Sequence, residues 1–312
     1  MHDLGDGVVN LEFQTKMNSI GSEILEAINK SVEIAEKDFK GLVIANDGQN
    51  FSAGANLAMM FMLAAEQEYE EIDMVVRQFQ NTTMHIRYSD IPVVVAPHTL
   101  TLGGGCEVCL HADKIEASAE TYIGLVEVGV GIIPAGGGTK EMTLRASESY
   151  TKDAVELPEL QWRFLNIAQA SVSTSAHEAF DMDLFKSGRD NIVINPHRLI
   201  AQAKKSVIDI ADRGYTQPFP RDDIKVLGRP ALSVMLLGAF SFHTANYISD
   251  HDKKIVEKLA YVMCGGDLSE STLVSEQYLL DLEREAFLSL ISEKKTLERI
   301  QSILTTGKPL RN

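Results

Sequence analysis

The chain has 312 residues, and 45% of them are hydrophobic, which is enough to bury a large core. Lys+Arg 29 against Asp+Glu 44 gives a net charge of -15, which argues against broad binding to nucleic acid or to an anionic membrane surface. No stretch approaches the roughly 18 to 20 apolar residues of a membrane span, and the N-terminus lacks a signal-peptide pattern. We therefore expect a soluble, cytoplasmic protein with neither nucleic acid nor membrane among its partners.

The first part of the chain alternates strand and helix patterns. Residues 2–7 read as a turn, and residues 8–13 alternate apolar side chains as a half-buried strand does. With Asn18 as the expected N-cap, residues 20–32 carry apolar side chains at helical spacing. Residues 40–46 then form the short apolar run that is typical of a strand buried on both faces.

Small residues dominate the loop at residues 47–57, which reads Asp-Gly-Gln-Asn-Phe-Ser-Ala-Gly-Ala-Asn-Leu. They leave backbone N–H groups accessible to a ligand, although a plain strand-to-helix connection would look the same. Residues 59–88 predict one long helix, whose methionine-rich start we assign to core packing, the alternative being an adaptable apolar wall. Residues 91–97 predict a second buried strand between two prolines.

Three consecutive glycines follow that strand, in the sequence Thr-Leu-Gly-Gly-Gly-Cys-Glu-Val-Cys-Leu-His at residues 101–111. A helix that begins at these glycines directs unpaired N–H groups and the positive end of its dipole toward an anion. Glu107 adds a carboxylate close by. The stretch is either an anion or oxyanion site with an acid–base group beside it, or a tight turn from strand to helix.

Three cysteines, Cys106, Cys109 and Cys264, are too few and too unevenly placed for a disulfide framework. The C-x-x-C pair at residues 106–109 has no second pair of metal ligands to accompany it and falls inside the predicted helix. We therefore expect small buried hydrophobic side chains and no metal site.

A second glycine-rich segment follows predicted strands at residues 112–117 and 121–127. It reads Val-Gly-Val-Gly-Ile-Ile-Pro-Ala-Gly-Gly-Gly-Thr at residues 128–139 and leads into a helix at residues 139–145. The alternation of strands and helices predicts βαβ units and an α/β fold. Neither glycine cluster fits the G-x-G-x-x-G pattern or a phosphate loop, which disfavours nicotinamide and ATP sites.

Helices are expected through most of the remaining chain. One is predicted from Asn195 to about residue 212, and the last eighty residues read as wholly helical. Four charged residues of that last part are assigned to a solvated face: Glu276, Glu283, Arg284 and Glu285.

Three motifs together resemble the enoyl-CoA hydratase/isomerase, or crotonase, superfamily. Residues 51–57 resemble its F-x-A-G-A-D-L/I loop, residues 102–107 match its L-G-G-G-C-E motif, and residues 127–139 resemble its E-x6-P-G-x-G-G-T segment. The motifs occur in the family's order and at its spacing, and the likeness is strong over residues 40–145.

The resemblance implies a crotonase-like spiral of ββα units in residues 1–195, the expected catalytic domain. A helical C-terminal region in residues 196–312 would then build a homo-oligomer based on trimers. Residues 191–198 and 307–312 are similar to the C-terminal hydratase portion of bacterial 3-hydroxyacyl-CoA dehydrogenase fusions. The chain would be the hydratase part of such a fusion, without the upstream dehydrogenase domain.

The family's site residues map onto the matched motifs. The backbone N–H groups of Ala55 and Gly104 would form the oxyanion hole, and Glu107 and Glu127 would be the two catalytic glutamates. Contacts to the substrate and its coenzyme A part would come from the following residues: Ala53, Asn56, Leu57, Ala58 and Pro134.

Two positions depart from the family pattern. Asn56 stands where the family has Asp, which would alter how the loop is anchored, and Ala135 stands where it has Gly, which adds a methyl group near the water site. Neither change removes a catalytic group. Lys308 and Arg311 would reach the nucleotide phosphates of coenzyme A, unless they are solvated charges of the tail.

A pair of glutamates favours hydration, because two carboxylates can share the proton transfers that water addition needs. The expected activity is that of a trans-2-enoyl-CoA hydratase in fatty-acid β-oxidation, with an acyl-CoA thioester as substrate and no tightly bound cofactor. Glu107 would activate the water and Glu127 would exchange the proton at C2. The alternatives are a double-bond isomerase of the same fold, or a non-catalytic module that binds acyl-CoA and docks a dehydrogenase.

Overall fold

A six-stranded sheet organises the first of two compact units in the computed structural model, which describes residues 1–312. The first unit comprises Met1–Asn56, Gln78–Gly124 and Val172–Pro220. The second unit comprises Leu57–Arg77, Leu125–Ser171 and Arg221–Asn312. The strands of the sheet, in their spatial order, are β1 (His2–Gly5), β2 (Val8–Leu11), β3 (Gly41–Ile44), β4 (Val93–Val95), β6 (Lys114–Ser118) and β8 (Asn191–Val193).

Two smaller strand pairs and the helices make up the rest of the structure. The pairs are β5 (Thr99–Leu102) with β7 (Thr121–Gly124), and β9 (Ile224–Val226) with β10 (Thr272–Val274). The α-helices are α1 Ser22–Asp38, α2 Leu57–Ala65, α3 Tyr69–Arg87, α4 Gly104–His111, α5 Gly138–Ser149, α6 Leu157–Ala168, α7 Ala176–Asp181, α8 Leu199–Asp212, α9 Gly228–Thr244, α10 Asp250–Met263, α11 Glu276–Ile291 and α12 Lys294–Thr306. The short 3-10 helices are η1 Lys16–Asn18, η2 Glu127–Val130 and η3 Pro196–Arg198.

The pairings from β2 to β8 in the main sheet are parallel, which confirms the α/β fold predicted from alternating strands and helices. Strand β1 is antiparallel to β2, with His2 opposite Asn10. The prediction of a turn over residues 2–7 is therefore wrong for most of that stretch. Only Asp6 and Gly7 turn, both with positive φ, and they join two strands of a hairpin.

In the first unit, the main-sheet strands β2, β3, β4 and β6 are each followed by an extended segment. These segments pair with one another and not with the main sheet. Strand β5 follows β4, and β7 follows β6 and pairs with β5 in parallel. After β3, Ser52 forms a parallel bridge with Thr101 of β5, and after β2, Ile20 forms one with Ala55. This repetition of two extended segments before a helix is the spiral of ββα units that the resemblance implies.

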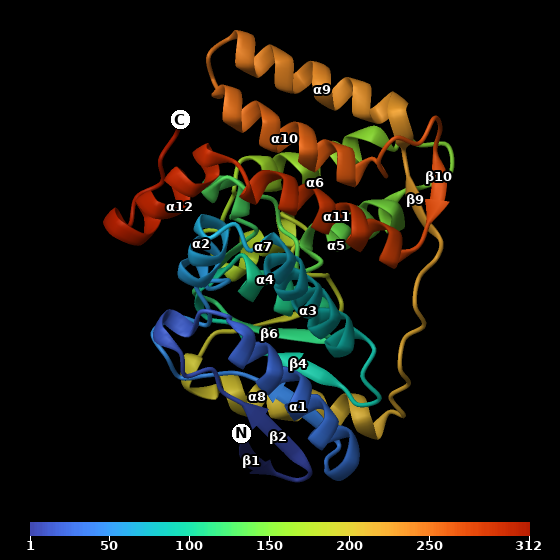
Figure 1. The fold of residues 1–312 in the computed structure, drawn as a ribbon. Coiled ribbons are helices and arrows are strands. Elements are labelled where there is room, and N and C mark those ends of the chain that lie inside the picture. Colours follow the sequence, from blue (N-terminus) through green and yellow to red (C-terminus); the bar gives the residue numbers. More distant parts are fainter. The chain divides into compact units, whose positions relative to one another are not determined.

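Helices cover the main sheet, as a parallel sheet requires. Helix α8 packs on β3, β4 and β6, where Leu199, Ala203 and Val207 contact a cluster that contains Val43 and Val94. Helix α1 packs on β2 and β3, and Figure 1 shows both helices beside the strands. All four residues of β3 are buried, which explains why residues 40–46 read as an uninterrupted apolar run.

Two helix predictions differ from the structure. Residues 59–88 form two helices, α2 and α3, because Gln67 between them adopts a left-handed φ of 63°. Asn18 does not cap α1, since Gly21 takes the N-cap position. Asn18 instead ends η1 with a φ of 50°, and its side-chain amide donates to the Asn50 carbonyl at 2.9 Å.

Helices α9 and α10 lie side by side in the second unit (Figure 1). The prediction that the last eighty residues are wholly helical fails at β10, which pairs with β9. Val274 of β10 is buried in a cluster with Leu144, Ile224 and Leu279. None of the helices combines the length and the apolar character needed to cross a membrane.

Candidate active site

Glycine is required at each of residues 103, 104 and 105, for a different steric reason at each position. Gly103 is the N-cap of α4 and has a φ of 51°, in the region that favours glycine. A Cβ on Gly104 would lie 2.7 Å from the ring of Phe79, and a Cβ on Gly105 would lie 2.7 Å from the Cβ of Ser52. Larger residues would push the start of α4 away from the loop that contains Ser52.

Main-chain hydrogen bonds hold the small-residue loop on both sides. The Leu102 N–H donates to the Ser52 carbonyl at 3.0 Å, which ties the loop to β5. The Ile20 N–H donates to the Gly54 carbonyl at 2.8 Å, and the Asn56 N–H donates to the Ile20 carbonyl at 2.9 Å. The backbone at Asn56 is thus anchored by a contact that does not depend on whether its side chain is Asn or Asp.

Two backbone N–H groups of this region, those of Ala55 and Gly104, lie on segments that contact each other. A Cβ on Gly104 would lie 3.4 Å from the Ala55 nitrogen, so the two backbone segments are in contact. Neither Ala55 nor Gly104 donates its N–H to another group of the chain. Gly104 also begins α4, whose N-terminal dipole favours negative charge at the same place. Preorganised donors of this kind stabilise a charge that develops during a reaction.

Glu107 adds an acid–base group to the same helix turn. It lies in the first turn of α4 and is 3% exposed. Its backbone N–H donates to the Gly103 carbonyl at 2.9 Å, so the helix geometry that presents Gly104 also fixes the start of the Glu107 side chain. The first unit therefore brings Ala55, Gly104 and Glu107 into one region.

Glu127 begins η2, three residues after the end of β7, and is half-buried. Gly131 ends this turn with a φ of 95°, and a Cβ there would lie 2.8 Å from the hydroxyl of Thr296. That hydroxyl donates to the Gly131 carbonyl at 2.9 Å and is 2.9 Å from Nε2 of His251. Helix α12, which carries the buried Thr296, thus holds the turn that carries Glu127.

The glycine-rich segment after Glu127 is anchored by Glu283 of α11. Its Oε1 accepts hydrogen bonds from the N–H groups of Gly137 and Thr139, each at 3.2 Å. Glu283 is fully buried, so its assignment to a solvated face is wrong. The same assignment is wrong for Glu276, which is 2% exposed and pairs with the buried Lys140 at 2.9 Å.

The other two charged residues of that group differ from each other. Arg284 is mostly buried and its Nε lies 2.8 Å from a carboxylate oxygen of Asp73, whereas Glu285 is exposed as expected. Helix α11 packs against α5, α10 and α12, so more than one of its faces is buried. Charge at helical spacing predicted a solvated face because the sequence does not show how many neighbours a helix has.

The predicted substrate contacts fall in both units. Ala53 and Asn56 lie in the first unit and are half-buried. Leu57 and Ala58 begin α2 in the second unit, where Ala58 is exposed. Pro134, also in the second unit, is buried, and its carbonyl accepts the hydroxyl of Thr139 at 2.9 Å.

The sequence correctly predicted the environment of the cysteines. Cys106, Cys109 and Cys264 are all free and buried. Burial raises the pKa of the Cys264 thiol to about 12 and raises the pKa of the Cys109 thiol as well. Both thiols therefore stay protonated and are unreactive as nucleophiles.

Known proteins resemble this chain in sequence motifs and in fold. Residues 4–158 match the enoyl-CoA hydratase/isomerase family. The structure of an enoyl-CoA hydratase from Bacillus halodurans superimposes with a TM-score of 0.63 at 14% identity, covering 96% of this chain and 98% of that one. A carnitinyl-CoA dehydratase from Mycobacterium thermoresistibile gives a TM-score of 0.68 at 15% identity, covering 97% and 88%. The chain belongs to the enoyl-CoA hydratase/isomerase, or crotonase, superfamily, and the predicted fold class is confirmed.

One relative is much more similar to this chain in sequence than these two structures are. A protein of Bacillus subtilis (strain 168) named as a probable 3-hydroxyacyl-CoA dehydrogenase is 47% identical to this chain over 313 residues. The match covers 99% of this chain but only 39% of the relative, so the chain spans well under half of that protein's length.

Proposed function

We propose that the chain is a trans-2-enoyl-CoA hydratase, which adds water across the C2–C3 double bond of an acyl-CoA thioester in fatty-acid β-oxidation. One observation carries the proposal. The backbone N–H groups of Ala55 and Gly104 lie on contacting segments and donate to no other group of the chain, and Glu107 is buried in the helix turn that begins at Gly104. The family contains hydratases and isomerases, so water addition is the specific step proposed here.

Water addition makes the thioester oxygen negative. When water attacks C3, the electrons of the double bond move toward the carbonyl, and its oxygen acquires enolate character. Two fixed donors stabilise this charge, and each is typically worth about two to three orders of magnitude in rate. In our proposal the N–H groups of Ala55 and Gly104 are these donors. Small side chains surround them because the thioester must approach the backbone closely.

Two carboxylates carry the proton transfers. Glu107 accepts a proton from the water whose oxygen bonds to C3, and Glu127 delivers a proton to C2, so that one water is added in total. The hydrogen bond between Thr296 and Gly131 supports this role for Glu127, because it restrains the turn on which the carboxylate lies. These steps use only side-chain and backbone groups, with the coenzyme A thioester as substrate.

The remaining contacts follow from the family motifs. We propose that the coenzyme A part lies along the small-residue loop and the start of α2, with contacts from Ala53, Asn56, Leu57, Ala58 and Pro134. Because the Bacillus subtilis relative is named as a dehydrogenase and is much longer, we also propose that this chain works beside a dehydrogenase part, which would oxidise the 3-hydroxyacyl product.

The test is an assay with crotonyl-CoA, in which hydration removes the absorbance of the conjugated thioester. Glu107→Gln and Glu127→Gln should each lower the rate by roughly a hundredfold or more, the scale of general acid–base catalysis. Glu285→Gln is the matched control, because Glu285 is exposed and should leave the rate unchanged. Unchanged turnover in both catalytic variants would contradict the proposal.

Two further measurements separate the alternatives. If the chain converts a 3-enoyl-CoA to the conjugated isomer but does not hydrate crotonyl-CoA, it is an isomerase. If calorimetry detects acyl-CoA binding while neither reaction occurs, the chain is a binding module.

A further inference from the structure

The turn that carries Glu127 is short and depends on its neighbours for its position. It is a single 3-10 turn, Glu127–Val130, and so short a helix makes few hydrogen bonds of its own. The Ile132 N–H donates to the Glu127 carbonyl at 3.2 Å, and the Gly131 N–H donates to the Val128 carbonyl at 3.1 Å. Because these bonds join the two ends of the turn, a shift of Gly131 also shifts Glu127.

Two successive hydrogen bonds fix the Gly131 end of this turn. The Thr296 hydroxyl donates to the Gly131 carbonyl at 2.9 Å, and its oxygen lies 2.9 Å from Nε2 of His251. A hydroxyl carries one hydrogen and a carbonyl can only accept, so the Thr296 oxygen must accept its second bond from His251. The His251 ring therefore carries a proton on Nε2.

The surroundings of His251 keep its ring neutral. It is 3% exposed and lies in the first turn of α10, where the positive end of the helix dipole disfavours a cation. Burial, and after it the guanidinium of Arg299, lower the pKa of His251 from its ordinary value of 6.5, although the carboxylates of Glu293 and Asp252 act in the opposite direction. A neutral ring has one N–H, so a single tautomer fits the contact with Thr296.

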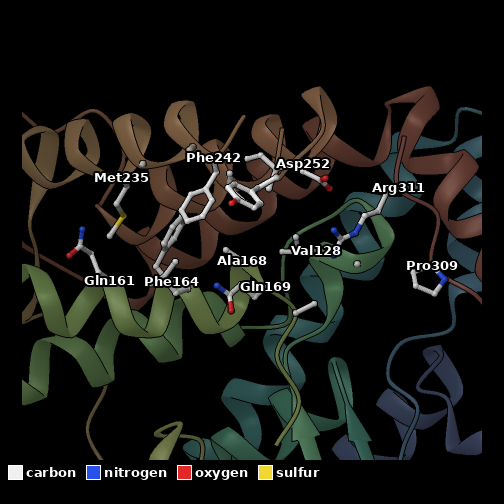
Figure 2. A pocket seen from close by; sticks show the side chains of 18 of the residues that line it. Val128, Gln161, Phe164, Ala168, Gln169, Met235, Phe242, Asp252, Pro309 and Arg311 are labelled. Carbon is white, nitrogen blue, oxygen red and sulfur yellow. The ribbon is translucent and has the colours of Figure 1, made fainter. Parts of the chain in front are cut away.

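A second contact beside the first holds α10 against α12. Asp252 directly follows His251, and Arg299 lies three residues after Thr296, so one turn of each helix supplies both contacts. Arg299 is 2% exposed, and its Nη1 lies 2.7 Å from a carboxylate oxygen of Asp252. Figure 2 shows Asp252 and Val128, which line the same open pocket, so this turn of α10 lies near η2.

We propose that His251 and Thr296 are positioning residues for Glu127. Through the Gly131 carbonyl they hold the turn so that the Glu127 carboxylate reaches C2 of the substrate. The inference rests on the proposed function, in which Glu127 delivers a proton to C2. A misplacement of about 1 Å can slow a reaction about a hundredfold. Loss of either hydrogen bond should therefore lower kcat and leave substrate binding intact.

Four variants test the two hydrogen bonds. Thr296→Val removes the hydroxyl at nearly constant volume, and His251→Leu removes the N–H donor. Each should lower kcat for crotonyl-CoA by roughly ten- to a hundredfold, while KM stays near that of the unmodified chain. Thr296→Ser keeps the hydroxyl, and the side-chain amide of His251→Gln still donates, so these two variants should retain most of the activity.

Thr305→Val is the matched control, because it makes the same substitution on the same helix. Thr305 is exposed, and its hydroxyl donates to the Gln301 carbonyl of α12 at 2.7 Å. This variant should keep the kcat and KM of the unmodified chain. Circular dichroism checks that every variant folds, and if Thr296→Val does not, His251→Leu and the two conservative variants still give the comparison.

A kinetic isotope effect separates a displaced carboxylate from a loss of stability. In the reverse reaction, the dehydration of 3-hydroxybutyryl-CoA, Glu127 takes a proton from C2, and Glu107 gives a proton to the hydroxyl that leaves C3 as water. With deuterium at C2, the isotope effect on kcat should be larger in Thr296→Val and His251→Leu, because transfer to a misplaced carboxylate is slower. Partial unfolding would only reduce the number of active molecules and leave the isotope effect unchanged.

Nitrogen-15 NMR of the histidine side chains tests the hydrogen bonds without any substrate. The signals of His251 in the full chain are identified by their absence from the spectrum of His251→Gln. At neutral pH we expect a proton on Nε2 that exchanges slowly with water, and faster exchange in Thr296→Val. A proton on Nδ1 instead would contradict the proposed hydrogen bonds.

Failure of this inference differs from failure of the proposed function. If the unmodified chain hydrates no enoyl-CoA, the proposed function is wrong, and the NMR measurement still decides whether His251 donates to Thr296. If crotonyl-CoA is hydrated but Thr296→Val and His251→Leu have the kcat of Thr305→Val, the positioning role is overturned. A lower kcat with an unchanged isotope effect would also overturn it, because the two residues would then act on stability alone.

Discussion

Glycine has opposite roles at Gly104 and Gly238, and replacement by alanine tests both. A methyl group at Gly104 would lie 2.7 Å from the buried ring of Phe79, whereas one at Gly238 would meet nothing within 4 Å. We expect Gly104→Ala to lower the free energy of unfolding by about 1–3 kcal/mol through overpacking. We expect Gly238→Ala to raise it by up to about 1 kcal/mol, because alanine favours the helix.

Urea unfolding followed by circular dichroism measures both changes in the free energy of unfolding. A double variant that also carries Phe79→Leu should recover part of the loss at Gly104, since the smaller side chain makes room for the methyl group. Equal stability of the two single variants would show that the contact with Phe79 is not what requires glycine.

Glu283 and Glu285 lie on the same helix, but only Glu283 is expected to matter. Removing the carboxylate of Glu283 leaves the buried N–H groups of Gly137 and Thr139 without this acceptor. Glu283→Ala should therefore lower the free energy of unfolding by about 1–3 kcal/mol. It should also slow crotonyl-CoA hydration, because the segment after Glu127 loses an anchor.

The matched control for Glu283 is Glu285→Ala. Its side chain is exposed, so the free energy of unfolding should change by less than about 0.5 kcal/mol. Thermal denaturation and the crotonyl-CoA assay, run on both variants side by side, decide the comparison. A loss of the same size in both would mean that the helix surface, and not the buried anchor, determines stability here.

At the scale of elements, Asp113 connects β4 with the segment that follows α8. Its carboxylate accepts the Val93 N–H at 2.8 Å and the hydroxyl of Tyr215 at 3.1 Å. Burial raises the pKa of Asp113 to about 6 from an ordinary value of 3.8, against the lowering effect of these hydrogen bonds. The folded state therefore holds this proton at pH values where the unfolded state has released it.

This pKa shift makes stability depend on pH with a definite sign. Between pH 3.8 and about 6 the folded state binds more protons at Asp113 than the unfolded state, so the contribution of Asp113 to the free energy of unfolding falls as the pH rises. Asp113→Asn should remove this slope. Relative to the unmodified chain, the variant should gain up to roughly 3 kcal/mol as the pH is raised through that window.

Chemical denaturation at several pH values between about 4 and 7 measures the effect of Asp113→Asn. A stability difference between the variant and the unmodified chain that stays constant across these pH values would refute the assignment of the shift to Asp113.

Local pattern predicted the elements of this chain well where a short run of residues is apolar throughout, because the element is buried on both faces. Residues 40–46 and 91–97 contain the buried strands β3 and β4, as their apolar runs indicated. Pattern failed where single residues adopt unusual backbone conformations. Gln67 splits the predicted helix of residues 59–88 with a positive φ, and Asp6 turns the chain so that residues 2–5 become a strand.

At the scale of the whole molecule, the remaining prediction concerns assembly. The family resemblance leads us to expect a homo-oligomer built from trimers. Light scattering on the purified chain should give three or six times the mass of one chain. A monomer that remains at high protein concentration would contradict this expectation.

The sequence by itself determined the family and the order of the ββα units, and its likeness to the family singled out Ala55 and Gly104 as the backbone donors that we propose. These features are local, because small residues leave a backbone N–H accessible, and glycine favours the positive φ that Gly103 adopts. Gly103, Gly104 and Ala55 could therefore be recognised from the sequence, together with Glu107 in the same motif as Gly104.

Only the tertiary structure decided which charged residues are buried and where space remains between helices. Glu283 and Thr296 belong to the C-terminal helices, yet they hold the turn and the glycine-rich segment more than a hundred residues earlier. The open pocket of about 660 Å³ beside Gly238 is likewise lined by residues of α6, α9 and α10 (Figure 2). Burial and free volume depend on how elements distant in sequence pack together, and hydrophobic periodicity describes each element only by itself.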